Sequence, residues 1–148
     1  MEDKRLTKRL VDYWDRLRKD LPLPSWERFN IEGLADVWGK CCVWRVEVAS
    51  SPDVRPQYMY EYVGASAEEA LGRNLTGMIF VSHAQQFAGA RITKRINEVV
   101  QNRTPLFDEG SFVNERNRTI KYRSCLLPFG TKDGKVTHIV LGLSWRSF

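Results

Sequence analysis

The sequence predicts an α+β domain in which helices pack on one face of a five-stranded antiparallel sheet, preceded by an amphipathic helix. Three observations support this fold class. Residues 107–145 have the pattern of three consecutive strands, residues 41–63 hold two more, and the segment between these groups has helical character. With 148 residues, the chain is long enough to bury one core without disulfides or metals.

An amphipathic helix is predicted over residues 3–19, followed by a proline-containing connector. Its apolar residues recur at helical spacing and form one stripe: Leu6, Leu10, Tyr13, Trp14 and Leu17. Such a stripe is buried either on the chain's own domain or on a second subunit, in which case these side chains form a homodimer interface. We therefore divide the chain into residues 1–24, the helix and connector, and residues 25–148, the main domain.

The first two strands are predicted at residues 41–48 and 57–63, after an irregular segment with a helical turn near residues 31–38. Side chains of a strand alternate between two faces. Adjacent Cys41 and Cys42 therefore point to opposite faces and do not share a metal ion. The side chains predicted to face the core are Cys42, Trp44, Val46 and Val48 in the first strand and Tyr58, Tyr60 and Tyr62 in the second.

Two helices are predicted between the strand groups. Ser66 and Glu69 have the spacing of a capping box, so a short helix is expected to begin there and to end at Gly72. Residues 78–86 show no clear pattern. Residues 87–102 are predicted to form a longer helix with one apolar face, made of Ala88, Ile92, Ile96 and Val99.

The last three strands are predicted at residues 107–114, 119–129 and 135–145. They are rich in β-branched and aromatic residues, which suit a half-buried pleated surface. Asp133 and Gly134 separate the last two strands and can take the positive φ angles of a tight hairpin turn. The meander is the clearest structural signal in the chain.

Composition argues against several classes of partner. The net charge of +5 is spread along the chain and interleaved with acids, so we expect no nucleic-acid partner. No segment approaches the roughly 20 apolar residues that span a bilayer, and we expect no membrane partner. Residues 1–9 lack the apolar core of a secretory signal, so we expect a cytoplasmic protein.

Catalytic and metal-binding patterns are missing from the sequence. The three cysteines, Cys41, Cys42 and Cys125, are best interpreted as small buried side chains. Pairing one of them with His83 or His138 would be needed for a nucleophile and base, and nothing in the spacing favours this. We expect no catalytic residues, no metal site and no enzyme activity.

The order of elements resembles the PAS fold, a small sensory module. Several strings resemble one bacterial subfamily of stand-alone PAS proteins with a Tyr-Trp pair in the N-terminal helix. They are Val11–Trp14, Leu21–Ser25, Tyr60–Gly64 and Leu71–Gly77, and the resemblance extends from about residue 9 to residue 145. It implies a sheet in which the first strand lies centrally, beside the last.

The resemblance also implies a cavity between the inner sheet face and the helices. The candidate lining residues, chosen by strand alternation and helix periodicity, are Trp44, Tyr60, Tyr62, Ile92, Ile96, Tyr122, Ser124 and Leu126. Flavin sensors of this family carry a cysteine where this chain has Leu75, and haem sensors carry a histidine in the longer helix, which residues 87–102 lack. We therefore expect no cofactor.

The resemblance implies a non-enzymatic sensory or regulatory module that binds a small ligand or a protein partner. Its signal would leave through the sheet or the N-terminal helix, in a homodimer. Because the sequence contains no output domain, signalling would occur in trans through a partner protein. The alternative is a small α+β enzyme or ligand carrier with a cone-shaped pocket. Strand order separates the two.

Overall fold

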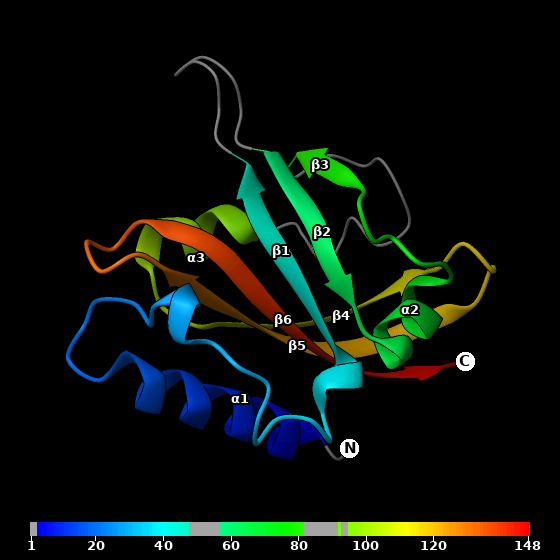
Figure 1. Cartoon of the computed structure of the whole chain (residues 1–148). Helices are drawn as coiled ribbons and strands as arrows, with labels where there is room; N and C mark the ends of the chain where they lie inside the picture. The colour runs from blue at the N-terminus through cyan, green and yellow to red at the C-terminus, as the bar shows by residue number, and fades with distance from the viewer. Residues whose placement is uncertain (1–2, 48–56, 82–91, 93–94) are drawn as a thin grey trace.

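The computed structural model describes residues 3–47, 57–81, 92 and 95–148, and its centre is one antiparallel sheet (Figure 1). The sheet has six strands in the order β3-β2-β1-β6-β5-β4. Their bounds are β1 Cys41–Glu47, β2 Gln57–Val63, β3 Ile79–Val81, β4 Leu106–Val113, β5 Thr119–Gly130 and β6 Val136–Ser147. Five correspond to the predicted strands. The additional one, β3, is a three-residue edge strand in the segment that showed no pattern.

Within the described residues, three α-helices pack on the two faces of this sheet: α1 (Asp3–Arg18), α2 (Ala65–Leu71) and α3 (Ile96–Asn102). Gly142 of β6 faces α1, because a Cβ built there would lie 2.4 Å from a Leu10 methyl group. Trp145 lies three residues further along the strand and therefore points to the other face. There its Nε1–H donates to Ser66 of α2. We call these the α1 face and the inner face. Short 3-10 helices at Trp26–Arg28 and Trp38–Lys40 connect α1 to β1.

The apolar stripe of α1 packs on the chain's own sheet. Leu6, Leu10 and Trp14 are buried, whereas Tyr13 and Leu17 are half-buried. The Trp14 Nε1–H donates to the Pro128 carbonyl oxygen at 2.6 Å and so ties the helix to β5. This is one of the two arrangements that the sequence left open. A contribution of the stripe to a homodimer stays a prediction.

Two helix starts differ from the sequence-based expectation. The predicted capping box is wrong, because α2 begins at Ala65 with Gly64 at its N-cap, and the Ser66 hydroxyl accepts from Trp145 instead. Gly72 ends α2 as predicted, with φ at 91°. The longer helix is confirmed only over α3, with Arg95 at its N-cap, and residues 87–91 and 93–94 lie outside the described part of the chain.

Tyr62 lies on the face opposite to the predicted one. The pairing of β1 with β2 is irregular: Val43 pairs with Tyr62, but the next residue, Trp44, pairs with Tyr60. This bulge inserts Glu61 as an additional residue and turns Tyr62 to the α1 face. There its ring stacks on Trp38 at 4.9 Å and its hydroxyl donates to the Trp38 carbonyl oxygen.

His138 is a half-buried titratable group on the α1 face. Its side chain is 12% exposed, its ring stacks on Trp26 at 4.2 Å, and its Nε2 lies 3.6 Å from a Glu61 carboxylate oxygen. Burial, with a smaller contribution from Arg45, nevertheless lowers the pKa of His138 from 6.5 to about 4. The imidazole is therefore neutral near pH 7.

We expect His138 to make the protein less stable in mild acid. The pKa of His138 is 6.5 in the unfolded chain and about 4 in the folded chain. Between these two pH values the imidazole is protonated in the unfolded chain and neutral in the folded chain, so proton binding favours unfolding. The free energy of unfolding should fall by about 3 kcal/mol across this window as pH falls, and be fully restored above it. Urea unfolding of the wild type and of His138→Gln at several pH values measures this. Equal pH slopes in the two proteins would contradict it.

Candidate functional site

The inner face of the sheet brings most of the predicted lining residues together. Seven of the eight are buried there or at the helices that cover it, and Tyr62 is the exception described above. They come from β1, β2, β5, α3 and the residues just before α3: Trp44, Tyr60, Tyr122, Ser124, Leu126, Ile96 and Ile92. We call this set the inner site.

Trp44 lies at the aromatic centre of the inner site. Its ring meets those of Tyr60 at 5.8 Å and Phe80 at 5.7 Å, both edge to face. Burial raises the pKa of the Tyr60 hydroxyl well above its usual value, and a side-chain hydrogen-bonding contact with the Trp44 indole opposes that shift. The Trp44 Nε1–H itself is buried and makes no hydrogen bond of ordinary geometry to any described residue.

A buried donor without an acceptor is unfavourable by about 1–3 kcal/mol, so such a group calls for an explanation. The side chain of Trp44 is fully buried, at 0% exposure, which keeps bulk water away from this donor. An acceptor supplied by a bound molecule would satisfy it. Among the described residues, no group of ordinary hydrogen-bond geometry supplies that acceptor.

A polar network closes the inner site beside β4. The Tyr122 hydroxyl donates to an Asp108 carboxylate oxygen at 3.1 Å, and the same carboxylate lies 3.7 Å from the guanidinium of Arg95. Hydrogen bonds to Glu98 are the main cause of a raised pKa at Arg95, so its guanidinium stays charged at neutral pH. We call Tyr122, Asp108 and Arg95 the rim network.

Sequence reasoning did not single out Asp108 or Arg95. A signal for Asp108 existed, since it is an acidic residue at a position of the strand that alternation turns inward, beside Ser124. Arg95 carried no such signal. It lies next to the N-terminus of α3, whose start the periodicity did not locate.

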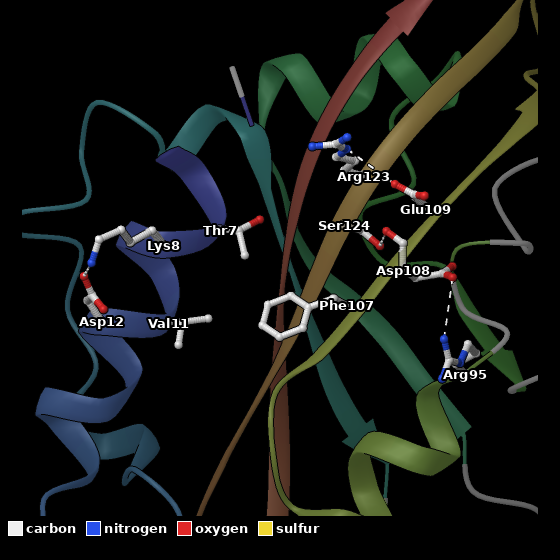
Figure 2. Close-up of a pocket in the computed structure, with 10 residues that line it drawn as sticks. All are labelled: Thr7, Lys8, Val11, Asp12, Arg95, Phe107, Asp108, Glu109, Arg123 and Ser124. Carbon is white, nitrogen blue, oxygen red and sulfur yellow. Dashed lines mark hydrogen bonds and ion pairs between the residues drawn. The ribbon is translucent and has the colours of Figure 1, made fainter. Parts of the chain in front are cut away.

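A groove of about 680 Å³ lies on the α1 face and reaches the rim network (Figure 2). Thr7, Lys8, Val11 and Asp12 of α1 form one wall, and β4 and β5 form the other. Figure 2 shows the Phe107 ring projecting toward α1, and this side chain is 52% exposed. We call this the α1 groove.

Ion pairs border the α1 groove. Lys8 pairs with Asp12 at 2.8 Å on the helix, and Arg123 pairs with Glu109 at 3.4 Å on the sheet. Ser124 is the one predicted lining residue that borders it, and its hydroxyl donates to the Asp108 carbonyl oxygen at 3.4 Å. The groove thus extends from α1 to the Arg95–Asp108 pair.

The cysteines offer no activated thiol. Cys41, Cys42 and Cys125 are all buried, as predicted. Burial raises the pKa of Cys41 strongly and raises the pKa values of Cys42 and Cys125 to about 12. All three stay protonated at neutral pH and are poor nucleophiles.

The described residues contain neither a metal-binding cluster nor a membrane-spanning helix. No group of three or more histidine, cysteine or acidic side chains is placed to hold a metal ion there. None of the helices in the described ranges is long and apolar enough to cross a bilayer. His83, the other histidine considered from the sequence, lies outside those ranges.

Comparison with known proteins gives likenesses among solved structures only. No protein-family model matches the chain, and no curated protein matches it. It is similar to VqmA bound to DPO, at 10% identity and a TM-score of 0.49, over 79% of this chain and 58% of that one. An RNA-binding light-oxygen-voltage receptor is similar at 13% identity and 0.49, over 82% of this chain and 35% of the receptor.

The PAS domain of Bordetella pertussis BvgS is similar at 16% identity and a TM-score of 0.41, over 78% of this chain and 79% of that domain. At such low scores the fold assignment rests on strand order. β1 lies centrally, between β2 and the last strand β6, and β4 to β6 form a meander, as the sequence predicted for a PAS sheet. The chain has a PAS-type fold with one additional edge strand.

Proposed function

We propose that this chain is a non-enzymatic sensory or regulatory module that binds a small ligand at the inner site and signals in trans to a protein partner. The observation that carries the proposal is the buried Nε1–H of Trp44, for which no described residue supplies an acceptor of ordinary geometry. The protonated state of all three cysteine thiols supports the non-enzymatic part.

The surroundings of Trp44 define the class of ligand. Aromatic rings of Tyr60 and Phe80 lie against the indole, and the inner-site residues Leu126 and Ile96 are aliphatic and buried. A charged molecule would lose its hydration there without a charged partner at Trp44, which is costly. We therefore expect a neutral, mostly apolar molecule with one hydrogen-bond acceptor directed at the indole.

The rim network offers a route from the inner site to the surface. Tyr122 faces the inner site, and Asp108, which its hydroxyl contacts, borders the α1 groove together with Arg95. A ligand that moves Tyr122 would change the Arg95–Asp108 contact and thereby the groove beside α1. The partner protein would read this change at α1 and at the exposed Phe107 ring.

We also propose a homodimer, and the packing of α1 restricts how such a dimer can form. Leu6, Leu10 and Trp14 are buried against the chain's own sheet. A dimer built on this stripe would therefore exchange α1 between copies, each helix packing on the other copy's sheet.

Native mass spectrometry of the purified chain tests the ligand. We expect the wild type to carry a small molecule of defined mass, and Trp44→Phe to lose most of it, because phenylalanine keeps an aromatic ring but has no N–H donor. Trp145→Phe is the matched control, since the indole of Trp145 already donates to Ser66. Bare protein masses in all three samples, persisting after incubation with a library of neutral metabolites, would reject the proposal.

A further inference from the structure

We propose a second binding site, for a small anion attached to a flat ring, between α2 and the turn that joins β4 to β5. A pocket of about 320 Å³ lies there, which is at the lower end of the size range of small-molecule sites. Arg116, Arg118, Trp145, Ile120 and Ser147 are among its lining residues. We call it the turn pocket. It shares no residue with the inner site, so the proposal stands independently of the function proposed above.

The two arginines supply positive charge that the described residues leave unbalanced. Neither guanidinium makes an ion pair or a side-chain hydrogen bond with a described residue, and only their backbone N–H groups are engaged. The adjacent carboxylate, Glu115, is already paired with Arg73 at 2.7 Å. Among the described lining residues Glu69 is the one acid, so two arginines and one acid give these residues a net charge of +1.

Asn114 fixes the place from which both arginines project. It is 4% exposed, and its Oδ1 accepts from the backbone N–H groups of Arg116 at 2.9 Å and Arg118 at 3.0 Å. Its Nδ2–H donates to the Ala70 carbonyl oxygen of α2 at 3.0 Å. The turn is thus anchored to α2, which reduces the conformational freedom that binding would otherwise remove.

The remaining walls suit a flat ring. The indole of Trp145 is held by donation from its Nε1–H to the backbone oxygen and the hydroxyl of Ser66, each at 3.1 Å. Ile120 is fully buried and forms an apolar floor. Guanidinium groups bind carboxylate and phosphate in the same forked geometry. The shared ligand chemistry is therefore an oxyanion on a flat ring, either an aromatic carboxylate or a nucleotide phosphate.

Calorimetric titration of the full chain with four probes tests this site. The anionic probes are AMP and indole-3-acetate, and the matched neutral probes are adenosine and indole. We expect at least one anionic probe to bind, and its neutral counterpart to bind at least about tenfold more weakly. Which anion binds better identifies the source of the negative charge.

Variants connect the binding to the turn pocket. Replacing both arginines, Arg116→Gln with Arg118→Gln, should weaken the anionic probe at least about tenfold. Arg146→Gln removes an exposed charge from the end of β6 without touching the pocket and should leave binding unchanged. Trp44→Phe should also leave it unchanged, so that failure of the inner site and failure of this site are distinguishable. Equal affinity in the double variant, equal binding of the neutral probes, or no heat from either anion at millimolar concentration would overturn the proposal.

Discussion

Trp14→Ala should lower the free energy of unfolding by about 4 kcal/mol, the largest effect expected from a single substitution in α1. The side chain is 4% exposed, and its removal would leave a cavity between α1 and the sheet. It would also leave the Pro128 carbonyl oxygen, which accepts from the indole at 2.6 Å, without its partner. Urea unfolding monitored by circular dichroism measures the change.

Leu17→Ala is the matched control for Trp14→Ala, because Leu17 belongs to the same stripe but is only half-buried. Leu17→Ala should lower the free energy of unfolding by clearly less than Trp14→Ala does. A cost below about 1 kcal/mol for Trp14→Ala would show that the helix does not pack on the sheet as described. If the free energy of unfolding of the wild type instead rises with protein concentration, the helix packs on a second copy of the chain.

Gly64→Ala should destabilise the protein by about 3 kcal/mol, because Gly39 of the 3-10 helix before β1 leaves no room for a methyl group there. A Cβ at Gly64 would lie 2.3 Å from the Gly39 carbonyl oxygen and 2.5 Å from its carbon. These are backbone atoms, so no side-chain rotation relieves the clash. The Gly64 N–H also donates to the Cys41 carbonyl oxygen at 2.8 Å, and separation of the segments would strain this bond. Thermal and urea unfolding both report the loss.

Gly39→Ala provides the control from the other side of the same contact. A Cβ at Gly39 would meet nothing within 4 Å, so this variant should unfold within about 0.5 kcal/mol of the wild type. Equal stability of Gly64→Ala and Gly39→Ala would mean that the two segments do not approach as closely as described.

Periodicity and turn chemistry predicted most of the sheet. The bounds of β2 agree with the predicted residues 57–63, and Gly134 takes the positive φ, 90°, expected of the hairpin before β6. β3 escaped detection because three residues are too few to show an alternation. The capping box failed because Ser66 finds a partner 79 positions away in Trp145, a tertiary contact that local spacing does not encode.

The inner site was predicted from side-chain direction, and its one error has a local cause. Alternation assigned Tyr60 and Tyr62 to the same face, which holds only where the pairing is regular. The bulge at Glu61 breaks that regularity. The unsatisfied donor on Trp44 had no signal in the sequence, because satisfaction depends on which groups the fold brings within hydrogen-bond distance. The contacts of the rim network were not predicted for the same reason, because they too depend on which groups the fold brings together.

The most direct test of the ligand proposal is the indole N–H spectrum of ¹⁵N-labelled protein before and after ligand removal. The protein as purified is compared with the same protein unfolded, dialysed and refolded. We predict that the Trp44 resonance moves, whereas those of Trp14 and Trp145, which donate to protein oxygens in both samples, stay in place. If the Trp44 resonance coincides in the two samples, and neutral metabolites added to the refolded protein do not move it, the inner site holds no ligand.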